Sequence, residues 1–184
     1  MLNAHLVTAE NLAIVLDMWH KIFPNETLWC GFALAENCFQ KSLHDPYLRY
    51  YIHYNGDTPV GISGIYKEDA EPESAWLGWF GVLPEYRRQG FGTKIMDYFI
   101  QECRSLGKKY ARLYTGAENT IGQKFYEAYG YKGEPYTADH PYDPEELIIY
   151  SLSLCNEPVP PWNNRHLHIW VTKNWFNCAF KTRN

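Results

Sequence analysis

Hydrophobic positions recur along the chain with two different periods, which divide it into helices and strands. Residues 2–8 have the pattern of a short strand, and Thr8 is a candidate cap for a helix that starts near Ala9 and ends by Pro24. In the next segment, which Pro46 closes, apolar residues recur every three or four positions, so a second helix is predicted. These residues are Leu28, Phe32, Ala35, Phe39 and Leu43.

After Pro46 the apolar period changes to two, which indicates strands. Asn55-Gly56-Asp57 is a hairpin signal, and the acidic segment 68–74 has the composition of a loop. Strands are therefore predicted over 48–55, 59–67 and 75–83.

The clearest helix follows a glycine-containing turn after Pro84, because its apolar residues form one stripe and Gly107 suits its C-terminal cap. The stripe consists of Ile95, Met96, Phe99, Cys103 and Leu106. The remaining pattern predicts a strand, a helix that ends at Gly130, and two closing strands. These elements span 110–115, 119–129, 131–137 and 146–154.

The C-terminal segment differs from the rest in composition. Residues 155–184 contain the stiff run Pro158-Val159-Pro160-Pro161, followed by aromatic residues among basic ones and a candidate strand at 166–172. Because 184 residues suit a single domain, we predict one domain over 1–154. The extension over 155–184 is expected to pack on that domain or on a partner subunit, which would make the protein a homodimer.

Composition narrows the class of protein. With 46% hydrophobic and 21% charged residues and a net charge of -4, the chain is expected to be soluble and not to bind nucleic acid. No apolar run approaches the ~20 residues of a membrane span, and no signal-peptide pattern is present, so a cytoplasmic protein is expected. Five cysteines without a Cys-x-x-Cys pair predict free thiols and no metal site.

A glycine-rich turn lies between a predicted strand and the clearest helix. In the run from Arg87 to Gly92, Gly90 and Gly92 allow close approach of the backbone to a ligand. The first helical turn offers unpaired N–H groups, and Lys94 adds positive charge, so a pyrophosphate would fit. A Walker loop and a Rossmann fingerprint are excluded by the missing Gly-Lys-Ser/Thr end and the missing third glycine. A tight turn with solvated arginines is the alternative.

The segment from Val82 to Gly92 resembles the signature of the GNAT superfamily of N-acetyltransferases, in which Arg or Gln is followed by two residues, Gly, one residue, and Gly or Ala. Arg87, Gly90 and Gly92 match this core. The order of elements over 2–154 is also similar. The resemblance implies an α+β, three-layer fold with a mixed, mostly antiparallel central sheet of six to seven strands flanked by helices.

The resemblance also implies how acetyl-CoA would bind. Backbone groups from Arg88 to Thr93 would hold the pyrophosphate, and the strand ending Phe80-Gly81-Val82 would pair with the pantetheine arm, with Gly81 a candidate bulge. The Val82 N–H is a candidate oxyanion donor. The expected acetyl-CoA-binding residues are Phe80, Gly81, Val82, Arg87, Arg88, Gln89, Gly90, Phe91, Gly92, Thr93, Lys94, Asn119, Gly122 and Tyr126.

Residues 119–131 resemble a later helix motif of the same superfamily, which often ends Phe-Tyr-x-x-x-Gly-Phe. Helical geometry predicts one face that packs on the sheet and another that a cofactor can approach. The first carries Ile121, Phe125 and Ala128, and the second Asn119, Gly122 and Tyr126. The resemblance implies that Asn119 contacts the cofactor and that Tyr126 is the general acid for the coenzyme A thiolate. A packed tyrosine with an exposed hydroxyl is the alternative.

The acceptor and the general base are less readable. An amine of pKa near 10.4 is neutral in roughly one molecule in two thousand at pH 7, so a base, a water relay or a desolvated pocket is needed. The strand over 75–82 contains no carboxylate or imidazole. Candidates that could act through water are Glu68, Asp69 and Glu118.

Family analogy puts His44 and Asp45 on the acceptor side. Trp76 and Trp79 fall on opposite faces of their strand by a period of two. One of them could line the acceptor cleft, where it would favour an apolar or cationic acceptor, and packing in the core explains them equally well.

We therefore expect an N-acetyltransferase that moves an acetyl group from acetyl-CoA to a primary amine of a small molecule or peptide, by direct attack in a ternary complex. The alternatives are a non-catalytic acyl-CoA-binding sensor or assembly module, and an acyltransferase that prefers a longer acyl group. An acetyl-CoA co-substrate and no metal are expected in the leading interpretation.

Overall fold

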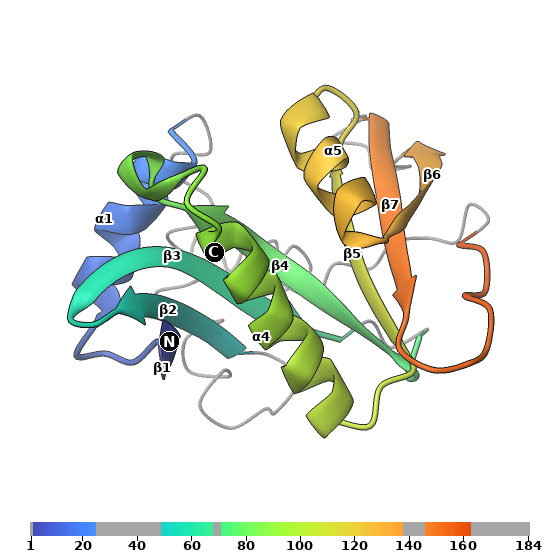
Figure 1. Cartoon of the computed structure of the whole chain (residues 1–184), viewed down its shortest axis with the longest axis horizontal. Coiled ribbons are helices and arrows are strands. Elements are labelled where there is room, and N and C mark those ends of the chain that lie inside the picture. The colour runs from blue at the N-terminus through green and yellow to red at the C-terminus, as the bar shows by residue number, and fades with distance from the viewer. Residues whose placement is uncertain (1, 25–48, 68–70, 138–145, 163–184) are drawn as a thin grey trace, which may run out of the picture.

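The computed structural model describes residues 2–24, 49–67, 71–137 and 146–162. These residues form a seven-stranded sheet in the order β1-β2-β3-β4-β5-β7-β6 (Figure 1). The strands are β1 Leu2–Leu6, β2 Arg49–Asn55, β3 Thr58–Tyr66, β4 Ser74–Val82, β5 Tyr110–Gly116, β6 Lys132–Thr137 and β7 Glu146–Ser153. The helices of the described part are α1 Leu12–Ile22, the short 3-10 helix η2 Pro84–Tyr86, α4 Phe91–Ser105 and α5 Thr120–Tyr129. Only the β4–β5 pair is parallel among these strands, so the predicted mixed, mostly antiparallel sheet is confirmed.

The first helix begins later than the sequence pattern predicts. It starts at Leu12, and the residue at its N-terminus is Asn11 rather than Thr8. The Asn11 side chain accepts a hydrogen bond from the Thr8 N–H at 2.7 Å and donates one to the Leu6 carbonyl at 2.9 Å. Asn11 therefore closes the turn between β1 and α1, and the helix begins directly after it.

Several other predictions fall on residues that the structure does not describe. These are the helix over Leu28–Leu43, the acceptor-side residues His44 and Asp45, the candidate bases Glu68 and Asp69, and the strand over 166–172.

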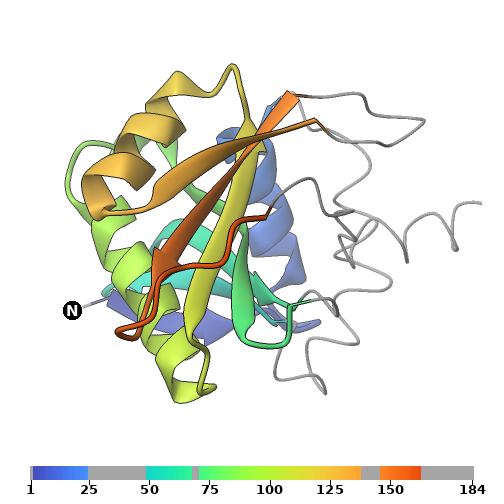
Figure 2. The same cartoon turned by 90° about the vertical axis from the view of Figure 1, so that its right-hand side faces the viewer.

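Helices cover both faces of the sheet, as expected for three layers. One hydrophobic cluster joins α1, through Val15 and Trp19, to residues of the sheet that include Ile62 and Trp76. The other joins α4 and α5 to the opposite face, with Met96 of α4 and Tyr126 of α5 among its members. Figure 2 shows α4 and α5 on one side of the strands and α1 on the other.

The central strands β4 and β5 are paired at one end and separate at the other. Their parallel pairing runs only from Ser74 opposite Tyr110 to Trp76 opposite Arg112. Beyond this point β4 stays with β3 and β5 stays with β7, so the two strands diverge (Figure 1). The gap that opens between them leaves one edge of β4 without a strand partner among the described residues.

A β-bulge in β4 lies where the strands diverge. Ser63 alone separates Ile62 from Gly64 on β3, whereas two residues, Trp79 and Phe80, separate their partners on β4. The predicted bulge therefore exists, but it lies before Gly81. Gly81 has a different constraint, because a Cβ there would collide with the Ile22 side chain of α1.

The extra residue of the bulge also overturns the prediction that Trp76 and Trp79 face opposite ways. Both tryptophans pack with the hydrophobic cluster on the α1 side of the sheet. Strict alternation would separate two residues three positions apart, but a bulge inserts one residue and reverses the order of the faces beyond it.

The paired end of β4 and β5 is held together by a buried arginine. Arg112 is fully buried, and its guanidinium lies 3.3 Å from a Glu71 carboxylate oxygen. It also donates to the Ser151 hydroxyl at 2.6 Å and to the Pro160 carbonyl at 2.8 Å. Burial lowers the pKa of this guanidinium, because a buried charge loses its hydration.

The C-terminal segment reaches the same cluster. Trp162 is fully buried, with its ring 5.0 Å from that of Trp76 and 5.4 Å from the Arg112 guanidinium carbon. Up to Trp162, this segment therefore packs on the domain itself. Packing of residues 163–184 on a partner subunit stays a prediction.

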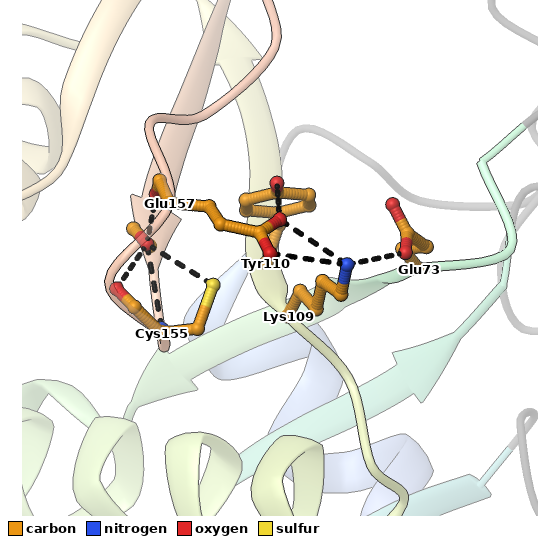
Figure 3. Close-up of polar contacts among 6 residues, drawn as sticks. Glu73, Lys109, Tyr110, Cys155 and Glu157 are labelled. Carbon is orange, nitrogen blue, oxygen red and sulfur yellow. Dashed lines mark hydrogen bonds and ion pairs between the residues drawn. The ribbon is translucent and has the colours of Figure 1, made fainter.

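Surface contacts fasten the beginning of this segment to the start of β5 (Figure 3). The Lys109 ammonium lies 2.9 Å from Glu73 and 3.1 Å from Glu157, and the Tyr110 hydroxyl donates to Glu157 at 3.3 Å. The Ser153 hydroxyl donates to the Glu157 carbonyl at 2.7 Å. Because exposed ion pairs stabilise little, we expect these contacts to add little to the free energy of unfolding.

A buried histidine makes the stability of the fold sensitive to acid. The Nε2 atom of His53 lies 2.7 Å from the Ser63 hydroxyl, and within the described residues its Nδ1 atom has no partner. Burial lowers the pKa of His53 from 6.5 to about 4. In the unfolded chain His53 becomes protonated as the pH falls below about 6.5, whereas in the folded protein it stays neutral until about pH 4.

We therefore expect the free energy of unfolding to fall by about 3 kcal/mol between pH 7 and pH 4 because of His53. The full contribution of the neutral histidine is present above pH 6.5. Urea unfolding of the wild type and of His53→Gln at both pH values measures this, because carboxylates titrate alike in the two proteins. A smaller loss on acidification is expected for His53→Gln. Equal losses in the two proteins would contradict the assignment.

Candidate functional site

The turn between β4 and α4 presents a row of backbone N–H groups. The Arg87 N–H donates to the Pro84 carbonyl at 3.3 Å, and the next N–H with a backbone acceptor in the described part of the chain is that of Lys94, which donates to Gly90 at 3.2 Å. The six amides of residues 88–93 between them have no backbone acceptor there. Free N–H groups at the positive end of a helix dipole form an anion-binding site.

The conformation of this turn depends on two residues with positive φ. Gly90 has φ 78° and immediately precedes α4, and Arg88 has φ 62°. A Cβ on Gly90 would have no neighbour within 4 Å, so the space beside it is open. A Cβ on Gly92 would lie 3.6 Å from the Phe125 ring, which is an ordinary contact. The packing of the protein therefore does not require a glycine at position 92, and a close-approaching ligand would explain it.

The side chains of the turn divide into two groups. Arg87 donates from Nε to the Val82 carbonyl at 3.1 Å, and Gln89 donates to the Glu85 carbonyl at 3.0 Å, so both shape the turn. Phe91 is buried and its ring packs edge-on against Tyr86, so its side chain belongs to the core. Its backbone N–H is one of the six free amides and is available to a ligand. Arg88, Thr93 and Lys94 are exposed, and the two cations among them add positive charge near the free amides.

The open edge of β4 continues the row of donors. The Leu83 N–H donates to Val60 of β3 at 2.9 Å. Because successive residues of a strand direct their N–H groups to opposite edges, the Val82 N–H points toward the gap between β4 and β5. The structure thus brings the predicted Val82 donor and the predicted phosphate turn onto one continuous stretch of backbone.

Phe80 and Tyr126 meet across this gap, from β4 and α5. The ring of Phe80 stacks on Phe125 at 5.6 Å and lies 6.3 Å from that of Tyr126. Tyr126 is 8% exposed and also contacts Tyr150 at 5.4 Å. Burial, with a smaller contribution from Tyr150, raises the pKa of Tyr126 well above its usual value of 10. Its phenol is therefore protonated at neutral pH, as a general acid must be.

The predicted faces of α5 are wrong. Ile121 is 79% exposed and Ala128 is exposed, although both were expected to pack on the sheet. Tyr126, from the face expected to be open, is the buried residue of the helix. The helix is turned so that the large ring of Tyr126, rather than the smaller Ile121 side chain in the first turn, fills the space beside Phe80 and Tyr150. Burial of an aromatic ring removes more apolar surface from water.

Asn119 and Gly122 form the start of α5. The Asn119 side chain accepts from the Gly122 N–H at 3.0 Å and donates to the Thr115 hydroxyl at 2.8 Å, so it is an N-cap. A Cβ on Gly122 would collide with that side-chain amide. Both residues thus have a structural explanation, and their contact with a cofactor stays a prediction.

The remaining candidate base of the described part is Glu118. Its carboxylate lies over Gly116, at the end of β5, where a Cβ would collide with it. Within the described residues no group of three or more histidine, cysteine or acidic side chains could hold a metal ion. Nor does this part of the chain contain a helix of the length and apolar character needed to cross a membrane.

The sequence pattern does not identify two aromatic residues that lie near the gap. Trp19 and Phe23, on and just after α1, contact Trp79 of the bulge with ring separations of 4.1 and 5.6 Å. Their spacing is that of an ordinary apolar helix face, and only the packing of α1 on β4 brings them here.

Comparison with known proteins agrees with this geometry. The model of the acetyltransferase (GNAT) family matches residues 12–131. The aminoalkylphosphonate N-acetyltransferase of Salmonella typhimurium is 24% identical over 128 residues, which cover 68% of this chain and 81% of that protein.

Solved structures share the fold. The ribosomal-protein-S18-alanine N-acetyltransferase of Escherichia coli superposes with a TM-score of 0.63 at 18% identity, over 88% of this chain and all of that one. A GNAT family acetyltransferase from Elizabethkingia anophelis, solved with acetyl-CoA bound, superposes with a TM-score of 0.60 at 18% identity, over 83% of this chain and 98% of that one.

Proposed function

Because the chain belongs to the acetyltransferase (GNAT) family and is an acetyl-CoA-dependent N-acetyltransferase, we propose that it acetylates a primary amine of a small molecule or peptide by direct attack in a ternary complex. The observation that carries the proposal is the row of free amides over residues 88–93, continuous with the open edge of β4. An anionic cofactor with an extended arm fits such an arrangement, because the turn receives phosphate and the strand edge receives amide groups.

The residues fit acetyl-CoA in three places. The amides from Arg88 to Thr93 would hold its pyrophosphate, with the exposed charges of Arg88 and Lys94 beside it. The Val82 N–H would face its pantetheine arm or its acetyl oxygen. Phe80 and Tyr126 would lie at the reacting end, since they meet across the gap.

Acetyl-CoA, when bound, supplies an acetyl group activated as a thioester. The protein contributes the donors and the proton. An N–H fixed toward the gap, such as that of Val82, stabilises the negative charge that develops on the acyl oxygen. Tyr126 holds a proton on its phenol oxygen, in a buried position where that proton is retained at neutral pH, and can deliver it to the departing thiolate.

Chemistry shared by the relatives supports the proposed acceptor class. One acts on an aminoalkylphosphonate and another on an alanine of a ribosomal protein, as their names state. Both acceptors present a primary amine. We propose the same reacting group for this protein, on a small molecule or a peptide.

The decisive experiment measures release of free coenzyme A thiol from acetyl-CoA over a panel of primary amines, in the wild type and in Gly90→Glu. The substitution adds bulk and negative charge beside the free amides. We expect it to raise the acetyl-CoA KM, or the dissociation constant measured by titration, at least about tenfold. If this variant bound acetyl-CoA with wild-type affinity, the turn would not be the phosphate site.

Gly107→Glu is the matched control. Gly107 also has a left-handed backbone, φ 67°, with open space around its Cβ position, but it lies at the opposite end of α4. Glutamate therefore meets similar backbone strain at both positions, and only the one at position 90 faces the proposed phosphate site. We expect Gly107→Glu to bind acetyl-CoA like the wild type. Binding without thiol release over the whole panel would instead point to a non-catalytic acyl-CoA-binding protein.

A further inference from the structure

The two bulge residues of β4 face opposite sides of the sheet at the gap. Phe80 lies on the side of α4 and α5, against Phe125 and Tyr126. Trp79 lies on the side of α1, against Trp19 and Phe23. The residues proposed to hold acetyl-CoA, namely the turn before α4 and Tyr126 of α5, share the Phe80 side. An acceptor that attacks the acetyl group from the other face would meet Trp79.

The backbone of Trp79 is strained. Its φ of 45° lies in the left-handed region, which bulky side chains rarely adopt. A residue held in such a conformation at the point where two central strands part is a candidate for function, because the surrounding fold must offset its cost. Without this conformation and the extra residue, strict alternation would direct the indole to the α4–α5 side, where Phe80 now lies.

Trp79, Trp19 and Phe23 form a continuous aromatic wall. The Trp19 and Trp79 rings are 4.1 Å apart, and Phe23 meets Trp79 edge-on at 5.6 Å. Trp19 is almost completely buried, and within the described residues its indole N–H has no hydrogen-bond partner. Trp79 and Phe23 keep part of their surface exposed. The face of an aromatic ring carries partial negative charge, so it attracts cationic groups and disfavours anions, and its apolar surface packs against apolar groups.

Resting on the proposed function, we propose that this wall is the specificity-determining surface for the acceptor, with Trp79 in contact with the carbon skeleton next to the reacting amine. The acceptor class is a primary amine with an apolar, aryl or alkyl substituent. An amine whose substituent is anionic is disfavoured, although the Salmonella relative acts on an aminoalkylphosphonate.

Two probes of equal spacer length test this proposal. In 2-phenylethylamine and 2-aminoethylphosphonate, two carbons separate the amine from an aromatic ring and from an anion, respectively. We expect the wild type to have the higher kcat/KM for 2-phenylethylamine. In Trp79→Leu the KM for that amine should rise about tenfold, while the KM for acetyl-CoA stays unchanged. Trp79→Phe, which retains a ring, should restore most of the affinity.

Phe80→Leu is the matched variant on the opposite side of the bulge. It should alter the KM for acetyl-CoA and leave that for 2-phenylethylamine near the wild-type value. Thermal unfolding of each variant separates these effects from loss of the fold. Preference for 2-aminoethylphosphonate, or an unchanged amine KM in Trp79→Leu, overturns the inference and leaves the proposed function standing. Absence of turnover with every amine of the wider panel refutes both.

Discussion

Arg112→Ala is expected to lower the free energy of unfolding by about 3–5 kcal/mol. Arg112 is completely buried, and its removal leaves the Glu71 carboxylate, itself 6% exposed, without its guanidinium partner at 3.3 Å. The Ser151 hydroxyl and the Pro160 carbonyl lose donors at 2.6 and 2.8 Å in the same change. Buried polar groups that lose a partner bear their full desolvation cost.

The measurement is urea unfolding followed by circular dichroism. Arg104→Ala is the matched control, because Arg104 is an exposed arginine in the last turn of α4. A change within about 0.5 kcal/mol is expected there. The same small change in Arg112→Ala would show that the cluster does not hold the paired end of β4 and β5.

Arg112→Ala should also loosen the C-terminal segment. Both the Pro160 carbonyl and the Trp162 ring contact the guanidinium. We therefore expect faster amide hydrogen exchange near Trp162 than in the wild type, together with the global loss of stability. This readout ties the extension to the same cluster.

Tyr126→Phe is expected to lower kcat by about 10²–10⁴-fold, the range usual for loss of a general acid. The ring contacts with Phe80 and Tyr150 survive the substitution, so the fold and the acetyl-CoA KM should change little. The pKa of Tyr126 is raised by burial, so in the wild type the acid should remain protonated across neutral and mildly alkaline pH. No fall in kcat from ionisation of this phenol is expected below pH 10.

Steady-state kinetics with an amine that the wild type acetylates gives the comparison. Tyr129→Phe is the control on the same helix, since its hydroxyl donates to Asp97 at 2.6 Å on the surface of the protein. The Tyr129→Phe variant loses a phenol hydroxyl but leaves the residues at the gap between β4 and β5 unchanged, so nearly full kcat is expected. Full turnover in Tyr126→Phe as well would leave Tyr126 a packing residue.

The turn before α4 was predictable because its conformation is local. Two glycines, flanking cations and a helix start within a few residues of one another, and the row of free amides follows from the geometry of any helix N-terminus. The same holds for the hairpin at Gly56 and the left-handed ends of helices at Gly107 and Gly130, each of which has a positive φ. Short-range sterics decide these features, so the residues themselves carry the information.

The faces of α5 and β4 were not predictable in the same way. A period of 3.6 assigns Ile121 and Tyr126 to different faces of α5. Which face packs inward depends on the side chains that the sheet presents to the helix. A period of two separates Trp76 from Trp79 until a bulge, visible only in the pairing of β4 with β3, reverses the order. Nor did the sequence pattern reveal that the Asn119 side chain caps α5.

The amino-acid sequence by itself thus determined the family of the fold, the order of its described elements and the turn proposed to bind acetyl-CoA, because each depends on neighbours within one turn or one strand. Tertiary structure alone decided which side chains meet. It joined Arg112 to Glu71 and Pro160, Tyr126 to Phe80, and Trp79 to Trp19. Such contacts depend on how elements far apart in the chain exclude water together, which no local pattern specifies.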